Sequence, residues 1–379
     1  MQMSKTRQKY EQLSPSGAQS VTKKNRTRSG RELLAAMKAA QKKKPQPVKA
    51  ASQKNSSAQS EQVRFIKVNA SSDGQRLDNF LLSELKGVPK SMIYRVIRSG
   101  EVRINKGRVH PDSRVSEGDE VRIPPIRVSA QPQEKKAPPL KLSEIPTILY
   151  EDEHILAVDK PSGMASHGGS GISFGLIERM RASRPDLPFL ELVHRLDRGT
   201  SGVLVLAKTR KALVRLHEMI REGQMHKTYK TLVKGDWQND RQHVKFPLYK
   251  YVTASGERRV RVDEEQGLPS HSIFRLIERF GAVSLLEVDL LTGRTHQIRV
   301  HAAHLGFPLV GDEKYGDFEF NGEVEHGLLG YPFKRMFLHA GSIAFHHPVS
   351  GIDLKIEAPL PKECRELLDA LERKKRDAL

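Results

Sequence analysis

Most of the second half of the chain alternates between short apolar runs and polar turn residues, a pattern typical of β-strands. The run Val203–Ala207 is continuously apolar and predicts a buried strand. The predicted strands of this region lie at 148–150, 155–158, 203–207, 227–234, 284–290, 337–345 and 352–357. We expect the first two to pair around a turn and the last two to form a hairpin. The strand at 227–234 should direct Tyr229 into a cleft.

Helical spacing of apolar residues is rarer in this region. The segment 211–222 predicts an amphipathic helix with Leu213, Leu216 and Ile220 inward. A second helix is expected after Thr295, which can serve as its N-cap, and Arg299 should project from its first turns. A short charged helix should end the chain. Residues 144–379 therefore predict an α+β fold, a mixed but mainly antiparallel sheet with flanking helices.

Residues 63–127 predict a separate small α/β unit. Apolar residues at 77, 80, 81 and 85 indicate one helix, and Met92–Ser99 a second, with Ser91 as N-cap and Gly100 as stop. Short strands follow near 102–105 and 121–123, with a turn at Lys106–Gly107. The basic residues expected on one side of this unit are Lys86, Lys90, Arg95, Arg98, Arg103, Lys106 and Arg108. They form either a nucleic-acid contact or an ordinary solvated face.

Residues 1–62 predict a disordered basic tail, because the first 60 residues contain 14 Lys and Arg but only Glu11 and Glu32 as acids. Only 30–44 has the pattern of a transient helix. The tail can grip phosphates, act as a solubilising extension, or serve as a transit peptide. Residues 128–143 are rich in proline without periodicity and predict a linker.

The net charge of +19 indicates a polyanionic partner, either nucleic acid or an anionic membrane surface. No apolar run approaches the length needed to span a bilayer, so we expect no membrane insertion. The chain has one cysteine, Cys364, which excludes an internal disulfide and a Cys-rich zinc module. This cysteine usage is typical of a reducing compartment, and we expect a cytoplasmic protein.

Candidate chemistry is densest in the loop 194–202, just before the buried strand. Asp197 lies between Arg195 and Arg198, and two glycines allow the backbone to turn tightly. A carboxylate flanked by fixed positive charges stays ionised, which suits nucleophilic attack better than proton donation. The alternative is a structural Arg–Asp pair that closes a turn. Lys160 and Lys208, at strand ends, are either phosphate contacts or ordinary lysines.

A second dense motif, 292–301, is followed by a third histidine. His296, His301 and His304 could suggest a metal, but their spacing differs from that of zinc hydrolases and no acidic ligand is near. We therefore expect no metal site, and histidines that lie in the core or contact a nucleic acid.

Three motifs together resemble those of the pseudouridine synthases that act on bacterial large-subunit ribosomal RNA. They are His-Arg-Leu-Asp-x-x-Thr-Ser-Gly at 194–202, Asp-Lys-Pro-Ser-Gly at 159–163 and Gly-Arg-Thr-His-Gln-Ile-Arg-Val-His at 293–301. The pattern at 95–105 resembles the S4-like RNA-binding domain. The resemblance covers about 63–379, with two departures: Gly199 stands where an acid is more usual, and the basic leader is long.

The resemblance implies an enzyme that isomerises uridine to pseudouridine in ribosomal RNA without cofactor or metal. Asp197 would be the nucleophile, Arg299 its partner, and Tyr229 the residue that stacks on uracil. Arg195 would fill the gap left by the flipped nucleotide. The further RNA contacts expected from these motifs and from the S4-like domain are His194, Lys160, Lys208, Arg294, His296, Lys90, Arg95, Arg98 and Arg103. We expect a monomer.

Two alternatives remain at this level. A non-catalytic RNA-binding or ribosome-assembly protein would explain the charge and the S4-like domain equally well, but it would not need Asp197, Tyr229 and Arg299 together. A synthase of the same family acting on transfer RNA would share every motif, because substrate choice depends on surface shape. The motifs also leave open whether Asp197 attacks the ribose or the uracil ring.

Overall fold

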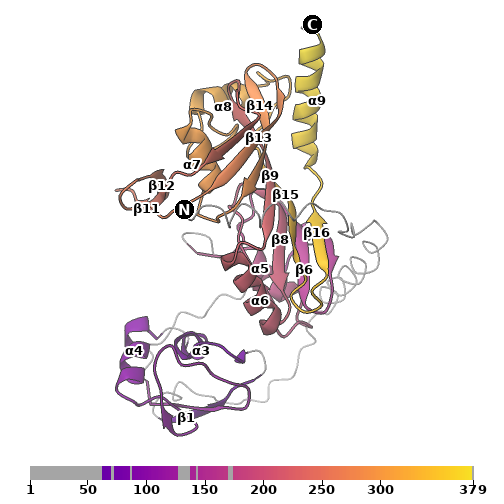
Figure 1. The fold of residues 1–379 in the computed structure, drawn as a ribbon. Helices are drawn as coiled ribbons and strands as arrows, with labels where there is room; N and C mark the ends of the chain where they lie inside the picture. The colour runs from indigo at the N-terminus through magenta and orange to yellow at the C-terminus, as the bar shows by residue number, and fades with distance from the viewer. Residues whose placement is uncertain are drawn as a thin grey trace, which may run out of the picture. The chain divides into compact units, whose positions relative to one another are not determined.

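The computed structural model describes residues 62–69, 72–85, 88–126, 137–141, 144–169 and 174–377. The predicted basic tail, its helix at 30–44, Lys86 and most of the predicted linker lie outside the described residues. The chain divides into two compact units, and each is considered by itself (Figure 1). One described part of the predicted linker already belongs to the larger unit, because Leu140 is fully buried and its N–H donates to Ser183 Oγ at 2.8 Å.

The small unit is a four-stranded antiparallel sheet with two helices. Its strands are β1 (Arg64–Lys67), β2 (Arg103–Ile104), β3 (Gly107–Arg108) and β4 (Glu120–Ile123), in the order β1-β4-β2-β3. The helices are α3 (Leu77–Glu84) and α4 (Lys90–Arg98). Leu77, Phe80 and Leu81 from α3 pack with Ile93 and Ile97 from α4 in one apolar core. The unit thus has the predicted two helices followed by short strands, with β1 as an unpredicted strand ahead of them, and it has its own core.

Two local predictions in this unit are wrong. Helix α4 begins at Lys90 with Pro89 at its N-cap, so Ser91 lies inside the first turn and does not cap. The hairpin turn lies one residue earlier than predicted, because Asn105 and Lys106 both have left-handed φ angles of 49° and 69°. Asn105 tolerates this conformation and bonds Asp119 and the Glu120 N–H through its side chain. Gly100, with φ 76°, follows the end of α4 as expected.

The large unit is built on a ten-stranded sheet. The order along its main path is β10-β13-β14-β9-β15-β8-β6-β5, while β16 pairs with β15 and β7 pairs with β8. The strands are β5 (Thr147–Glu151), β6 (Ile155–Lys160), β7 (Glu191–Leu192), β8 (Ser201–Ala207), β9 (His226–Lys234), β10 (Arg241–Val244), β13 (Ser272–Arg279), β14 (Val283–Leu290), β15 (Leu338–His346) and β16 (Asp353–Glu357). Every pairing is antiparallel except β8 with β15. The α+β class and the predicted hairpins are confirmed.

Helices and one extra hairpin flank this sheet (Figure 1). The helices are α5 (Leu176–Ser183), α6 (Arg210–Arg221), α7 (Gln297–His304), α8 (Phe318–Glu325) and α9 (Lys362–Asp377). Strands β11 (Leu248–Val252) and β12 (Arg258–Val262) form a separate two-stranded ribbon. Helix α9 buries Cys364, Leu367 and Leu371 in a cluster with Phe333 and Phe337, so the C-terminal helix belongs to the core.

The centre of the sheet fixes the loop that the sequence singles out. All residues of β8 are buried, and its start pairs with β15 through Ser201 with His339 and Gly202 with Ala340. Gly202 has φ 112°, and a Cβ there would lie 2.2 Å from the Ala340 carbonyl oxygen. Only glycine permits this approach. The loop that ends at β8 is therefore held against the middle of the sheet.

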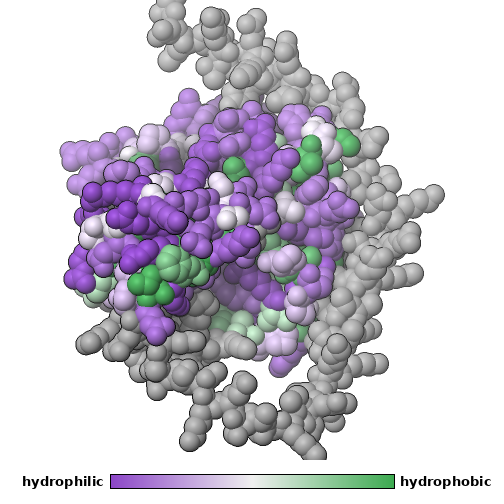
Figure 2. Space-filling view, turned by 90° about the horizontal axis from the view of Figure 1, so that it is seen from below, coloured by the Kyte–Doolittle hydropathy of each residue, from purple (hydrophilic) through white to green (hydrophobic). Residues whose placement is uncertain are grey.

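On the face shown in Figure 2, hydrophilic residues predominate and apolar ones form small separate areas. Within the described residues, no helix has the length and apolar character needed to cross a membrane.

Candidate active site

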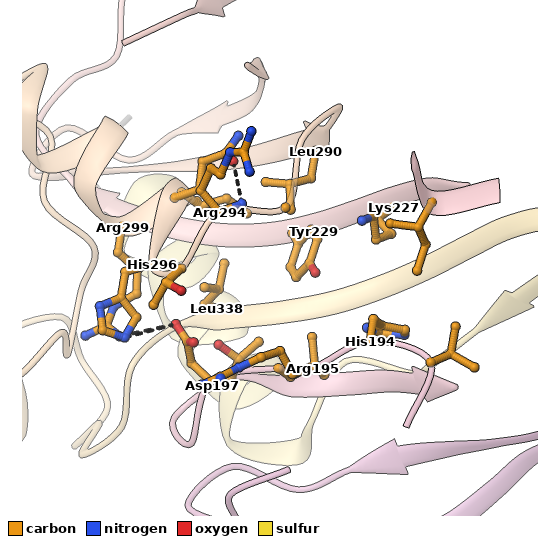
Figure 3. Close-up of a pocket in the computed structure, with 18 of the residues that line it drawn as sticks. His194, Arg195, Asp197, Lys227, Tyr229, Leu290, Arg294, His296, Arg299 and Leu338 are labelled. Atoms are coloured by element: carbon orange, nitrogen blue, oxygen red, sulfur yellow. Dashed lines mark hydrogen bonds and ion pairs between the residues drawn. The ribbon is translucent and has the colours of Figure 1, made fainter. Parts of the chain in front are cut away.

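The large unit contains a cavity of about 370 Å³ that is lined by the sequence motifs. Most of its walls come from three segments: the loop before β8, the first residues of β9, and the start of α7. The lining residues include His194, Arg195, Asp197, Thr200, His217, Arg221, Lys227, Tyr229, Leu290, Gly293, Arg294, His296, Arg299 and Leu338. Figure 3 shows Asp197 with His296 and Arg299 toward one end, Lys227 and His194 toward the other, and Tyr229 between them.

Asp197 is the one carboxylate among the described residues that line this cavity. Its Oδ2 lies 3.3 Å from Arg299 Nη1 and 3.8 Å from His296 Nε2, and 19% of its side chain remains exposed. The predicted partnership of Asp197 with Arg299 therefore has a matching geometry. The same carboxylate faces open cavity volume, where a substrate atom could approach it.

Arg299 is buried, and most of its guanidinium is bound elsewhere. Its Nε and Nη2 donate to the two carboxylate oxygens of Asp312, each at 2.7 Å, so only Nη1 is left for Asp197. Asp312 is fully buried and also accepts the N–H groups of Lys314 and Tyr315. The Arg299 charge holds the pKa of Asp312 below its usual range, although burial opposes this. Asp312 thus fixes the guanidinium plane that reaches Asp197.

His296 occupies the position where Thr295 was expected to cap α7. It is the N-cap residue with a left-handed φ of 55°, and no side chain caps the helix, so the prediction for Thr295 is wrong. Val260 N–H donates to Tyr315 Oη, which also bonds His296 Nδ1 at 2.8 Å and so fixes the imidazole ring. Burial lowers the pKa of His296 to about 4, so the ring is neutral at physiological pH, with Nε2 on the side of Asp197.

Tyr229 lies in the pocket wall on β9, as the strand pattern predicted. The residue is 7% exposed, and burial raises the pKa of its phenol, with the negative charge of Asp197 adding to the effect. The phenol stays neutral at physiological pH. Figure 3 shows its ring presented to the pocket beside Leu338 and Leu290, a flat apolar surface suited to a planar base.

Lys160 is not placed to bind a phosphate, which corrects that expectation. The residue is fully buried, and its Nζ donates to the carbonyls of Pro161 (2.9 Å), Met164 (2.7 Å) and Arg198 (3.4 Å). Burial lowers the pKa of Lys160 to about 7, and the charge of Asp197 acts in the opposite direction. Lys160 therefore ties the backbone that follows it to the backbone of the loop that carries Asp197.

Lys208 is also used internally. It follows the far end of β8, and its Nζ pairs with Glu151 at 2.8 Å and with the carbonyl of Asp152. Because β8 has seven residues, this places Lys208 roughly 20 Å of strand away from the loop that carries Asp197. The expectation that it contacts RNA at the site is not supported by this position.

The remaining predicted residues of this unit take different positions around the pocket. His194 lines it, but its Nε2 accepts the Val205 N–H at 3.2 Å and burial lowers its pKa to about 3, so it is a neutral structural group. Arg195 is exposed beside Asp197. Arg294 is exposed at the rim and donates through Nε to the Pro269 carbonyl. Arg195 and Arg294 thus remain accessible to a ligand.

The histidines of the second motif do not form a metal cluster. His301 is fully buried and bonded to Ser270, Ser272 and the Phe246 carbonyl, whereas His304 is exposed and packs edge-on against Phe246. In the part of the chain that the structure describes, no three His, Cys, Asp or Glu side chains are grouped as metal ligands would be. His301 is therefore one of the core histidines that the sequence allowed.

On the small unit, the four predicted contact residues are all exposed, namely Lys90, Arg95, Arg98 and Arg103. Lys90 and Arg98 both lie 5.9 Å from the centre of the Tyr94 ring. The sequence did not single out Asp312, Tyr315 or Lys227. The sequence offered only weak signals for them. Asp312 and Tyr315 lie three residues apart after a glycine, and Lys227 lies two residues before Tyr229.

The fold and the pocket agree with the comparisons to known proteins. A family model described as RNA pseudouridylate synthase matches residues 154–304, and one described as S4 domain matches residues 75–121. The chain belongs to the RNA pseudouridylate synthase family and is a pseudouridine synthase with an N-terminal S4 domain.

Its relatives narrow the resemblance further. Proteins named Ribosomal large subunit pseudouridine synthase C are 50% identical to it in Salmonella typhi, over 82% of this chain and 98% of the relative, and in Escherichia coli (strain K12), over 82% and 97%. The solved structure titled Human RNA Pseudouridylate Synthase Domain Containing 1 is 26% identical, covers 60% of this chain and 95% of its own, and has a TM-score of 0.46.

Proposed function

We propose that this enzyme converts specific uridines of large-subunit ribosomal RNA to pseudouridine with Asp197 as its nucleophile. The observation that carries the proposal is the meeting of Asp197, Tyr229 and Arg299 in one cavity, although they come from three separate segments. The names of the relatives support the choice of RNA. An RNA-binding protein without chemistry would have no use for an ionised carboxylate held beside an aromatic platform.

The reaction breaks the bond between ribose C1′ and uracil N1, rotates the base and forms a bond between C1′ and uracil C5; N1 takes up a proton and C5 releases one. Asp197 attacks either the ribose or the uracil ring while the target nucleotide is flipped out of its stack, and the bond it forms is broken again before the product leaves. Tyr229 stacks on the uracil. Arg299, held in plane by Asp312, keeps the carboxylate oriented, and neutral His296 lies 3.8 Å from the same carboxylate oxygen. Arg195 occupies the gap that the flipped nucleotide leaves. Protein side chains supply every group, so the scheme uses no cofactor or metal.

The rest of the chain anchors the RNA. The division we propose is a basic tail at 1–62, an S4-like RNA-binding domain at 63–127, a linker at 128–143 and the catalytic domain at 144–379. Lys90, Arg95, Arg98 and Arg103 bind phosphates from the S4-like domain, and Arg294 does so at the rim of the pocket. The enzyme works as a cytoplasmic monomer.

The test combines mapping with one substitution. Pseudouridines are mapped in ribosomal and transfer RNA from cells with the wild-type gene, without it, and with Asp197→Asn. Asn preserves size but removes the nucleophile, so sites that depend on the gene should be absent with the variant. RNA affinity should change by less than about 1 kcal/mol, because phosphate contacts dominate binding.

The exposed Asp240 supplies the matched control, since Asp240→Asn removes the same charge from the same unit and should leave every site intact. If Asp197→Asn kept the modifications, the nucleophile assignment would be wrong. Sites lost only from transfer RNA would contradict the ribosomal substrate but not the chemistry.

A further inference from the structure

The large unit holds two lysines near the pocket whose circumstances differ. The Lys160 ammonium is enclosed by three backbone carbonyls, as described above. Lys227 also lies largely out of solvent, yet its Nζ has no hydrogen-bond or ion-pair partner among the described residues. Burial alone lowers the pKa of Lys227, and no carboxylate offsets that effect. An ammonium placed this way is costly for the free protein unless a ligand meets it.

Lys227 projects into the cavity from the same face of β9 as Tyr229, because side chains two residues apart on a strand point the same way. Their Cα atoms are then about 6.6 Å apart along the strand. Gly293 lies against the ammonium, and a Cβ at that position would be 3.6 Å from Nζ. Figure 3 places Lys227 on the side of Tyr229 away from Asp197. A nucleotide whose base stacks on Tyr229 can therefore extend toward both residues.

The other cations of the cavity have different positions. Arg299 is bound by two carboxylates, Arg294 donates to a carbonyl at the rim, and Arg195 is exposed beside Asp197. His194, next to Lys227, is neutral, partly because of the nearby lysine charge. Arg221, at the end of α6, also lines the cavity but is exposed. Among the described residues, Lys227 is thus the cation of the cavity that lies largely out of solvent without a counterion. Uracil and ribose are uncharged, so the anionic part of the substrate is its phosphodiester.

We propose that Lys227 binds a phosphodiester that flanks the target uridine and so holds the flipped nucleotide in the cavity. This inference rests on the proposed function and adds a substrate contact to it. A lysine ammonium suits a phosphate as a compact point charge. The contact forms only after the nucleotide has entered the cavity, whereas exposed basic residues can bind any part of the strand.

The experiment deletes the charge on either partner. The probe is a synthetic RNA fragment with a uridine that the wild-type enzyme converts, made also with a neutral methylphosphonate on the 5′ or the 3′ side of that uridine. Lys227→Met should lower kcat/KM on the natural fragment at least about tenfold, which corresponds to loss of one charge-assisted contact. One methylphosphonate should lower the wild-type value similarly, and Lys227→Met should have no further effect on that RNA.

Salt dependence separates a phosphate contact from a hydrogen bond to a uracil carbonyl. The slope of log Kd against log salt should fall by about 0.7 in Lys227→Met, as expected for one phosphate of a single strand. The matched control is Lys230→Met, an exposed lysine on the opposite face of β9, which should retain wild-type kcat/KM on all three fragments.

Additive losses from the substitution and from both methylphosphonates, or an unchanged salt slope, would overturn the inference. So would a wild-type enzyme that converts both modified fragments as fast as the natural one, a result that does not depend on how the variant folds. A wild-type enzyme that converts no RNA would instead contradict the proposed function.

Discussion

The ion pair between Arg299 and Asp312 determines how the Asp197 carboxylate is held. Two parallel bonds of 2.7 Å fix the guanidinium plane, and the remaining nitrogen reaches Asp197 at 3.3 Å. A planar fork can serve two carboxylates in fixed directions, while an ammonium cannot. The Asp312 side chain is fully buried, so removal of its partner would also leave an uncompensated charge inside the protein.

Arg299→Lys should therefore reduce the single-turnover rate by at least about a hundredfold, roughly 3 kcal/mol of barrier, although it preserves the charge. RNA affinity should remain within a few-fold of wild type. Arg299→Ala should in addition lower the free energy of unfolding by about 3–5 kcal/mol, because Asp312 loses its partner. Rates on an RNA fragment and urea unfolding curves measure the two effects.

Arg275→Lys is the control, since Arg275 pairs with Asp289 and Glu287 in partly exposed positions. That variant should cost no more than about 1 kcal/mol and leave the rate unchanged. A wild-type rate in Arg299→Lys would show that the planar geometry is not needed.

At the scale of elements, helix α7 is fastened to the sheet by a histidine that must be neutral. His301 bonds Ser272 on β13, Ser270 and the Phe246 carbonyl, and burial lowers its pKa to about 4. An unfolded histidine has a pKa near 6.5. Between pH 6.5 and 4 the unfolded chain therefore binds more protons than the folded one, so stability present above pH 6.5 is lost as the pH falls through this window.

We expect His301 to contribute about 2 kcal/mol of destabilisation when the pH falls from 7 to 5. His301→Gln retains hydrogen-bonding groups but cannot titrate, so its unfolding free energy should fall less over this range than that of wild type. Urea unfolding at pH 7, 6 and 5 gives the comparison. His304→Gln, at an exposed position on the same helix, should show the wild-type dependence. Identical slopes for His301→Gln and wild type would refute the assignment.

The elements that the sequence predicted well are those determined by nearby residues. The continuous apolar run at 203–207 became β8, and the alternating or amphipathic segments became β9, α6 and the hairpin of β15 with β16. The errors at Ser91 and Thr295 have one cause: a residue type that can cap a helix does so only where the backbone places it. His296 is the N-cap instead, with a left-handed backbone conformation and its ring bonded to Tyr315, 19 residues further along the chain.

The candidate site, like the fold, was predictable where residues close together in the sequence identify it. Asp197 and Arg299 occur in motifs and Tyr229 in a predicted strand, and the structure brings all three into one cavity. Lys160 was misjudged because its three carbonyl partners, in the segment that follows it and in the Asp197 loop, are brought around its ammonium only in the folded chain. Asp312 and Lys227 were missed because an aspartate or a lysine in an ordinary segment gives no sign of what it will face. Only the burial and orientation of these side chains in the folded protein show what they contact.

For the whole molecule, positive charge is the dominant property, with a net charge of +19. The small unit presents Lys90, Arg95, Arg98 and Arg103 on its surface, and Lys90 and Arg98 lie beside the Tyr94 ring. Replacing all four with Gln in the full-length protein should weaken binding to large-subunit ribosomal RNA and lower the salt slope by about 0.9 per lost contact with a duplex phosphate. Turnover of bound RNA should change little, because none of the four lines the pocket.

Filter-binding titrations at several salt concentrations measure this. Four basic residues of α9 provide a control with the same change of net charge, namely Lys362, Arg365, Arg373 and Arg376. If both quadruple variants shift the slope equally, only the overall charge matters and the small unit is not a specific anchor.

Strands β8 and β15 pair through two residue pairs, and this pairing joins two stretches of the chain that are synthesised one after the other. Strands β5 to β8 come from residues 147–207, and the strands on the other side of the join come from 226–357. Asp197 belongs to the first stretch, while Tyr229, Arg299 and β15 belong to the second. While the second stretch is still being translated, the chain therefore carries Asp197, the proposed nucleophile, without Tyr229 and Arg299. We expect no pseudouridine formation until both stretches have been synthesised and have folded together.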